Sequence, residues 1–432
     1  SSLEVMGGSL GTAKGQAEAR ARSGPLRLAV GGSAFRTDGV SSVKGSETDG
    51  RDKASATGIF GYELANLDQV QVLLNTNQEK SSYDLPPKDD VNANTQNRAF
   101  QWKLRYESKW QTNARSTFML SGQDVDRDNR NPADLADASF YIDQSRGQRQ
   151  SFLNRNDFVW AGGLWHLGFE RNQEQGHFRN VSSSLPTTEF APSLSDDSVY
   201  LVNDRRFQSS DLAWGVRATC QDGMDCLAVY QGSYQYHWAE AERSVYAVVS
   251  TGLKRPTMYQ LYSTYGDPGL RAEKSQAFEA GFVQRWQTFQ KLRLTLFQNR
   301  FDDLIDYDFI ANRSRNVKRA KAQGIEVSHQ WDSAMGDAKI SLAQISSKNE
   351  VTDQRLLRRP IHQGAADAGL KWSEFLYFGA ELQYTGSRED IDSNGNRAMV
   401  ADFTLVNVLT TYKWRGVQYF VRVNNVADSS YE

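Results

Sequence analysis

The sequence predicts an all-β protein, a transmembrane antiparallel β-barrel that occupies residues 1–432 as one domain. Three observations predict it. Apolar and polar side chains alternate with a period of two along most of the chain, short and long connections alternate between these segments, and tryptophans gather beside the short connections. No long helical stripe and no run of about 18 apolar residues interrupts the pattern.

The alternation is clearest over residues 100–110. Trp102 and Leu104 fall on one parity, and Lys103 and Arg105 fall on the other. Because successive side chains of a strand point to opposite faces, this segment has one apolar and one charged face. The same pattern recurs over 226–238, 291–296 and 417–424.

The connections sort by length as well as by position. Ten short turns are expected near 23–25, 66–69, 111–114, 161–164, 208–211, 239–243, 287–290, 332–337, 373–375 and 415–416. Ten long polar connections are expected near 10–14, 41–54, 81–98, 127–149, 178–197, 220–226, 254–275, 306–322, 347–366 and 387–401. They separate about 21 strands, and short turns at one end with long loops at the other are typical of an outer-membrane barrel. Antiparallel closure needs an even number, so we expect a barrel of the 22-stranded type whose last strand is not in the sequence.

Tryptophan supports this interpretation, because an indole prefers the boundary between lipid and water. Eight of the ten tryptophans lie beside the short turns: Trp110, Trp160, Trp165, Trp238, Trp286, Trp331, Trp372 and Trp414. We therefore expect an aromatic girdle at one membrane interface. The alternative is that these side chains are core tryptophans that end strands.

Composition excludes other classes. The formal net charge of -2 argues against nucleic-acid binding, which needs a basic excess. The five histidines are scattered, with no metal-ligand or nucleophile motif, so we expect no enzyme and no catalytic cofactor. The mean hydropathy of -0.62 resembles that of a soluble protein, but in a barrel only one parity of each strand faces lipid.

The two cysteines, Cys220 and Cys226, flank a segment rich in turn-forming residues. Two thiols that close such a turn predict a disulfide formed in an oxidising compartment. Free thiols are the alternative. A metal site is less favoured because no histidine lies nearby.

Four segments resemble the C-terminal half of TonB-dependent outer-membrane transporters: residues 261–275, 302–307, 320–326 and 423–432. The cobalamin-transporter branch is similar in its Asp-Leu-Ile-Asp-Tyr run, here at 303–307, and in its Leu-Leu-Arg-Arg run, here at 356–359. Siderophore transporters share much of the same pattern.

The resemblance implies a barrel of 22 strands, occluded by an N-terminal plug, in the outer membrane of a Gram-negative bacterium. It also implies a TonB-type energy-transducing partner that acts through the plug, contact with lipid and lipopolysaccharide, and a monomer. This sequence opens on what resembles the first barrel strand, so we expect the plug domain to be absent from the chain.

Acidic side chains cluster in the second and third long connections. Clustered carboxylates are hard oxygen ligands that suit calcium, and cobalamin transporters are similar in using aspartates of these two loops to bind calcium. The residues concerned are Asp49 and Asp84, which match that pattern best, and Asp52, Asp89 and Asp90, which match by neighbourhood. By the same resemblance Tyr83 would contact substrate. The alternative is that these loops are acidic for solubility.

The loop over 254–275 carries Tyr259, Tyr262 and Tyr265 around Asp267. Exposed aromatic side chains on a mouth loop suit a large, partly apolar ligand, so these four residues are candidates for substrate binding. Structural packing is the alternative, because the segment is also part of the family resemblance.

The function that follows is energy-coupled import of a scarce nutrient, with cobalamin as the first expectation. A ferric siderophore or haem is the alternative ligand within the family. A passive channel is the alternative from another class, and it would bind no ligand specifically.

Overall fold

The computed structural model describes residues 1–40, 48–84, 92–133, 138–238, 240, 242–286, 289–308, 311–392 and 395–430, with only the backbone at 317 and 318. The chain divides into two compact units. Unit 1 comprises Ser1–Asn203, Val216–Ala228 and Thr257–Pro268, and unit 2 comprises Asp204–Gly215, Val229–Pro256 and Gly269–Glu432. Each unit is built on antiparallel strands and is described by itself.

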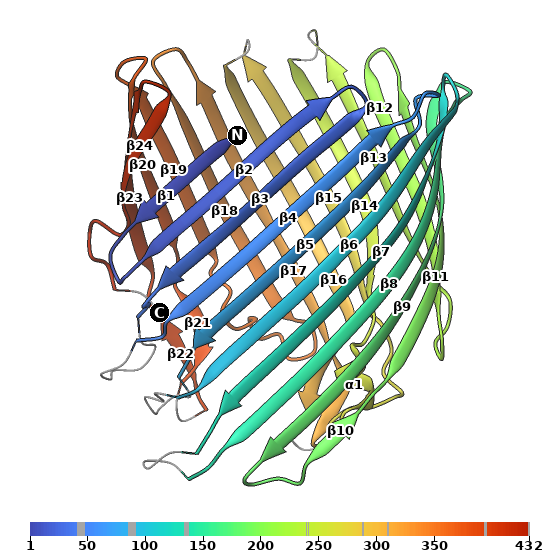
Figure 1. Ribbon diagram of the computed structural model, residues 1–432, viewed down its shortest axis with the longest axis vertical. Coiled ribbons are helices and arrows are strands. Elements are labelled where there is room, and N and C mark those ends of the chain that lie inside the picture. The colour runs from blue at the N-terminus through green and yellow to red at the C-terminus, as the bar shows by residue number, and fades with distance from the viewer. Residues whose placement is uncertain are drawn as a thin grey trace. The chain divides into compact units, whose positions relative to one another are not determined.

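Unit 1 is an antiparallel series in which β1 to β9 pair in chain order (Figure 1). Its strands are β1 (Ser2–Gly7), β2 (Ala13–Ser23), β3 (Leu26–Thr37), β4 (Arg51–Glu63), β5 (Gln69–Ser82), β6 (Asn94–Gln111), β7 (Ala114–Asn131), β8 (Tyr141–Trp160) and β9 (Gly163–Ser182). The short β10 (Thr188–Phe190) pairs with β9. Three further strands contribute residues to both units: β11 (Ser193–Arg206), β12 (Ser210–Gln221) and β13 (Leu227–Trp238).

Unit 2 continues the same arrangement, with each strand antiparallel to the next. Its strands are β14 (Arg243–Lys254), β15 (Glu273–Trp286), β16 (Gln290–Asp308), β17 (Arg313–Asp332), β18 (Gly336–Asn349), β19 (His362–Lys371), β20 (Leu376–Thr385), β23 (Phe403–Trp414) and β24 (Val417–Val423). Between β20 and β23, a separate hairpin is formed by β21 (Arg388–Ile391) and β22 (Arg397–Val400).

The all-β prediction is confirmed. In the described part of the chain, β1 to β9, β11 to β20, β23 and β24 are the 21 strands that the twenty expected connections separate. The expected lengths of several connections were wrong. The loop predicted over 127–149 is shorter and lies between Asn131 and Tyr141. The loop predicted over 306–322 is also shorter and lies between Asp308 and Arg313. These strands are longer than the 9–11 residues that cross a bilayer. Outside the bilayer both faces of a strand become polar, so the alternation of apolar and polar residues no longer indicates a strand there.

The register explains the alternation. In unit 1 one row across five neighbouring strands is apolar: Phe60, Val72, Leu104, Leu120 and Phe152. A row on the opposite face is polar: Lys103, Ser121, Ser151 and Asn172. Unit 2 repeats the apolar row with Val245, Phe282, Leu294, Val327 and Leu342. Each sheet therefore has an apolar face and a polar face, and we keep these two names below.

The eight tryptophans expected beside the short turns lie at or near strand ends, as the sequence predicts. Trp160, Trp238, Trp286 and Trp414 are each the last residue of their strand. At the same end of unit 1, Asp68 is 2% exposed in the turn between β4 and β5. Its carboxylate accepts hydrogen bonds from the Tyr106 hydroxyl at 2.6 Å and from the Lys109 backbone N–H at 3.0 Å. The Tyr106 hydrogen bond is the main cause that holds the pKa of this carboxyl below its ordinary value.

A short helix, α1 (Met258–Tyr262), lies in the connection between β14 and β15. Among the described residues, no helix has the length and apolar character that crossing a membrane would require.

Tyrosine rings pack over glycines on the polar face. In unit 2 the ring of Tyr246 lies over Gly281, where a Cβ would come within 2.5 Å of ring atoms. The Tyr246 hydroxyl donates to Glu279 Oε1 at 2.8 Å and lies 2.9 Å from Thr295 Oγ1. The same packing joins Tyr200 to Gly168 and Tyr377 to Gly369. These glycines therefore give the large side chains of the polar face room to lie flat.

We predict that Gly281→Val destabilises the protein by about 1–3 kcal/mol, because the added side chain displaces Tyr246 from its hydrogen bonds. Urea unfolding of the protein refolded in detergent would measure the loss. Gly147→Val is the control, since Gly147 is on the polar face of β8 with nothing within 4 Å of an added Cβ. Equal losses in the two variants would contradict the packing argument.

Candidate functional site

The connection that holds the predicted tyrosines is ordered by a helix cap. Thr257 Oγ1 accepts the Gln260 backbone N–H at 3.2 Å, and Gln260 Oε1 accepts the Thr257 N–H at 2.9 Å. This reciprocal pair is a capping box, which stabilises the start of α1. The helix belongs to unit 1, and its Leu261 is buried at 2% exposure. This segment is therefore ordered, and its side chains are held in fixed positions.

An aromatic cluster forms where α1 meets the ends of β9 and β10. Phe178 and Phe190 are opposite each other in the strand register, and their rings stack with centroids 4.8 Å apart and planes 13° apart. The Tyr259 ring lies 6.1 Å from each of them. Phe178 has the parity of Asn172, so the cluster is on the polar face. We call Phe178, Phe190 and Tyr259 the mouth cluster.

The predicted substrate residues differ in their access to solvent. Tyr259 is 48% exposed and Tyr262 is 42% exposed, whereas Tyr265 and Asp267 are half-buried. The Asp267 backbone N–H donates to the Gln260 carbonyl at 2.9 Å, which folds the segment back on α1. Tyr259 therefore packs against the two phenylalanines and still leaves 48% of its surface exposed, and substrate binding by this loop stays a prediction.

Sequence reasoning missed Phe178 and Phe190. Both fall in a segment predicted as a long connection, but β9 extends to Ser182 and β10 pairs with it. The signal available in the sequence was the alternation that continues through His177, Phe178 and Arg179. Their contact with Tyr259 joins residues far apart in the sequence, so no local pattern indicates it.

The two acidic connections lie beside each other. The Ser82 backbone N–H donates to the Gly50 carbonyl at 2.9 Å, which brings the segment of Asp49 against that of Tyr83 and Asp84. Asp49 is half-buried and Asp84 is 7% exposed. The Tyr83 hydroxyl is in hydrogen-bond contact with that of Tyr141. The structure thus places three predicted residues of two loops in neighbouring segments.

The remaining predicted metal ligands lie elsewhere. Asp52 is in β4, pairs in register with Lys80, and contacts Arg36 at 3.8 Å between exposed side chains. Its parity is that of Phe60, so it belongs to the apolar face. Asp89 and Asp90 fall outside the described residues. Within the described ranges no group of three His, Cys, Asp or Glu side chains is arranged to hold a metal, and calcium binding stays a prediction.

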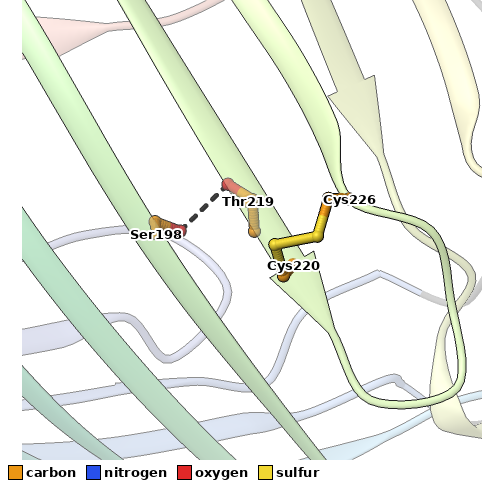
Figure 2. Close-up of a disulfide and its surroundings, with 4 residues drawn as sticks. All are labelled: Ser198, Thr219, Cys220 and Cys226. Atoms are coloured by element: carbon orange, nitrogen blue, oxygen red, sulfur yellow. Dashed lines mark hydrogen bonds between the residues drawn. A yellow bond between two sulfur atoms is a disulfide. The ribbon is translucent and has the colours of Figure 1, made fainter.

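Cys220 and Cys226 form a disulfide, which confirms the prediction. Figure 2 shows it at the end of β12, where the chain turns toward β13. Beside it, the hydroxyls of Ser198 in β11 and Thr219 in β12 lie 2.9 Å apart, and Ser198 is 1% exposed. The Asp222 backbone N–H also donates to the Ser195 carbonyl at 3.0 Å. The disulfide thus closes a loop that is already attached to the neighbouring strand.

The polar face of unit 1 carries a compact ion cluster around Asp157, which is 5% exposed. Its carboxylate accepts hydrogen bonds from Arg115 Nε at 2.9 Å and from Arg155 Nε at 2.6 Å. His166 Nδ1 lies 2.5 Å from the same carboxylate. On this part of the polar face, ion pairs and hydrogen bonds between neighbouring strands fix the charged side chains. A ligand in contact with it therefore meets polar groups in fixed positions.

In unit 2 the Leu-Leu-Arg-Arg run is fastened to the β21–β22 hairpin. Arg358 Nε lies 2.9 Å from both carboxylate oxygens of Asp390, and the Arg358 backbone N–H donates to the Glu389 carbonyl at 2.7 Å. The Ile391 backbone N–H and then the Arg358 guanidinium lower the pKa of the Asp390 carboxyl. Arg358 therefore serves as a contact between two loops.

A family model described as "TonB dependent receptor-like, beta-barrel" matches residues 32–426. The chain is similar in structure to the copper transporter OprC, with a TM-score of 0.86 and 13% identity over 100% of this chain and 74% of that one. It is also similar to the ferric yersiniabactin uptake receptor FyuA from Yersinia pestis, with a TM-score of 0.79 and 12% identity over 98% and 73% of the two chains. The FrpB iron transporter from Neisseria meningitidis (F3-3 variant) matches with a TM-score of 0.77 and 15% identity over 98% and 76%.

We predict that replacing both cysteines by serine lowers the free energy of unfolding by about 2 kcal/mol, the value expected when a short loop loses its cross-link in the chain-entropy model. Thermal unfolding of the variant and of the reduced wild-type protein would measure it. The two samples should agree, and the strand content should be unchanged. A loss of the whole sheet signal in the variant would contradict a local role for the disulfide.

Proposed function

The chain belongs to the TonB-dependent receptor β-barrel family, and from that premise we propose that it imports a metal chelate bearing aromatic or other apolar groups. Membership makes it an outer-membrane protein of Gram-negative bacteria and a nutrient receptor whose transport depends on TonB. The finer identity of the ligand is our proposal.

The mouth cluster is the observation that carries the proposal. Phe178, Phe190 and Tyr259 come from two strands and a capped helix, and they meet on the polar face at the end where the long connections lie. In a passive channel for small solutes, three aromatic rings grouped on the polar face would serve no function. Rings held by a capping box and a strand ladder offer a pre-organised apolar surface, and pre-organisation lowers the entropy that binding costs.

The ligand class is supported by the chemistry of the cluster and by the similar structures. Stacked rings with a phenol hydroxyl suit a ligand that has flat, partly apolar groups as well as polar ones. The similar solved structures include receptors for ferric yersiniabactin and for ferric catecholate. Cobalamin, the first expectation from the sequence, is large and partly apolar too, and it remains the second candidate through the runs at 303–307 and 356–359.

The partners of this function are proposed with it. We expect the TonB-type complex to act through a plug, and the apolar face with its tryptophans to contact lipid and lipopolysaccharide. Phe60 and Leu120 are 45% and 46% exposed on that face, as lipid contact requires. We expect a monomer, because the whole apolar face is then available to lipid.

We predict that Tyr259→Ala weakens ligand binding by about tenfold, since an aromatic ring in such a contact contributes roughly 0.5–1.5 kcal/mol beyond its buried area. Binding of ferric-catecholate, ferric-yersiniabactin and cyanocobalamin to the detergent-solubilised protein would be measured by fluorescence quenching. Tyr234→Ala is the control, because Tyr234 has the same 48% exposure but lies within β13.

The outcomes separate the candidate functions. Saturable binding of a ferric chelate that Tyr259→Ala weakens and Tyr234→Ala does not supports the proposal. Tight binding of cyanocobalamin alone would replace the chelate by cobalamin. No saturable binding of any probe, together with a large open conductance in a planar bilayer, would refute the receptor and support a passive channel.

We also propose that calcium orders the acidic connections, with Asp49 and Asp84 as ligands. The Ser82–Gly50 hydrogen bond joins the two segments, and carboxylates are the ligands calcium prefers. Calcium takes 6–8 oxygen ligands, so backbone carbonyls and further side chains must complete the shell. Asp52 is the least suited of the predicted ligands, because it has the parity of the apolar face.

We predict that calcium raises the thermal stability of the protein, by about 2.7 kcal/mol at a concentration one hundred times its dissociation constant. Asp84→Asn should abolish this gain, whereas Asp52→Asn should keep it. Differential scanning calorimetry with calcium and with a chelator would show the difference. If Asp84→Asn leaves the calcium-dependent increase in stability unchanged, Asp84 is not a calcium ligand.

A further inference from the structure

A groove of about 660 Å³ lies on the apolar face of unit 1, near the end of the strands where the long connections begin. Its floor is one register row of small or apolar side chains that crosses four strands: Val5 of β1, Gly15 of β2, Ala34 of β3 and Ala54 of β4. These positions have the parity of Phe60, so the floor belongs to the face that we expect to meet lipid. We call this feature the rim groove.

Basic side chains line the rim groove on the next register row. Arg36 of β3, Asp52 of β4 and Lys80 of β5 are successive register partners. Arg98 of β6 is diagonal to Lys80, because it is opposite Gln78, and long side chains can meet across a diagonal. The side chains of all four charged residues are exposed. On this face, three positive charges and one negative charge leave the groove with an excess of two positive charges.

The charged row lies where the apolar positions of the strands end. On β6, Arg98 follows Trp102 and Phe100 on the same face in the direction of the long connection, and on β3 Arg36 follows Val30 in that direction. Basic side chains at such a boundary lay their alkyl stems on apolar surface and direct their charges toward lipid headgroups. The rim groove therefore has the polarity of a lipid molecule, with charge at its outer end and an apolar surface below it.

The protein itself engages these charges only weakly. Arg36 Nε lies 3.8 Å from Asp52 Oδ1, and the two side chains are 72% and 64% exposed, so this pair contributes little. Asp126 is the register partner of Arg98 and contacts Arg146, at 3.6 Å. In the described part of the chain, Lys80 forms no ion pair. Because the strand backbones separate the two faces of the sheet, a plug on the polar face leaves the rim groove uncovered.

We propose that the rim groove binds one molecule of lipopolysaccharide, with a phosphate of its lipid A part on the basic row and an acyl chain on the floor. The inference rests on the lipid contact proposed above and deepens it, because it assigns one lipid to one place. A phosphate group carries about −1.5 to −2 charges at pH 7, which matches the excess of the groove. Guanidinium and ammonium groups bind its oxygens by charge-assisted hydrogen bonds.

The position of the rim groove selects lipopolysaccharide among the phosphate-bearing lipids. In outer-membrane barrels the short turns face the periplasm and the longer connections face the outside. The rim groove is at the end of the long connections, so it lies in the outer leaflet, where lipopolysaccharide is the main lipid.

Diphosphoryl lipid A is the probe for this site. It would be titrated into the whole protein in detergent, and native mass spectrometry would count the bound molecules. We expect one molecule to bind saturably to the wild-type protein. Lys80→Gln should weaken this binding about fivefold, the effect of one basic side chain near a membrane surface. Lys103→Gln is the matched control, since it removes the same charge from the polar face of β6.

The floor is tested separately from the charges. Ala54→Trp fills the floor without changing a charge, and we expect it to weaken lipid A binding at least about tenfold, the effect of losing two buried methylene groups. Ala19→Trp is its matched control, because Ala19 is on the apolar face of β2 and does not line the rim groove. Ala54 and Ala19 are both exposed, so an indole at either position can project toward lipid or detergent.

Each outcome decides for or against the site. Weaker binding to Lys80→Gln and Ala54→Trp, with unchanged binding to the two controls, supports it. Equal binding to all four variants means that lipid A coats the apolar face without a site, and this overturns the proposal, as does a wild-type protein that retains no lipid A. Phosphatidylglycerol that binds as tightly as lipid A overturns the choice of lipopolysaccharide.

The experiment is independent of transport. Lipid A is counted on purified protein without any chelate, so a cell that takes up no ferric chelate would refute the import function and leave this lipid site intact. Conversely, import of a chelate by a protein that retains no lipid A would refute the lipid site alone.

Discussion

The backbone hydrogen-bond ladder is the constraint on which the rest of the structure depends. In a hydrocarbon layer, every N–H and C=O group must find a partner within the protein, and neighbouring strands supply it. The ladder fixes which residues are opposite each other, as the row from Phe60 to Phe152 shows. One face of that ladder meets lipid and must be apolar. The other face carries no such obligation, and it is where the chain can place charges, rings and hollows.

This division explains how far the sequence could predict the structure. The period of two is a local property, and so are the turn residues between Cys220 and Cys226, so strands and disulfide follow from neighbouring residues alone. The lengths of the outer connections do not. Near Asn131 and Asp308 the strands leave the lipid, their outward side chains become polar, and the pattern that marks a strand disappears while the ladder continues.

The candidate site shows the same limit more sharply. Tyr259 could be named from its loop, because a cluster of tyrosines around a turn is visible in the sequence. Its partners Phe178 and Phe190 could not, since only the pairing of β9 with β10 and the docking of α1 bring the three rings together. Asp52 illustrates the converse. It lies in a cluster of acids in the sequence, but one position of register gives it the parity of the apolar face.

The polar face of unit 1 differs in chemistry from one end to the other. At the mouth, stacked rings present a rigid apolar surface, and contacts of that kind depend on shape and are little affected by salt. At the other end, charged side chains of adjacent strands pair with each other, as Arg27 does with Glu63, and contacts of that kind depend on charge and are weakened by salt. The two ends of the polar face therefore offer a ligand different contacts: a rigid aromatic surface at the mouth, and at the short-turn end charges that neighbouring strands already pair.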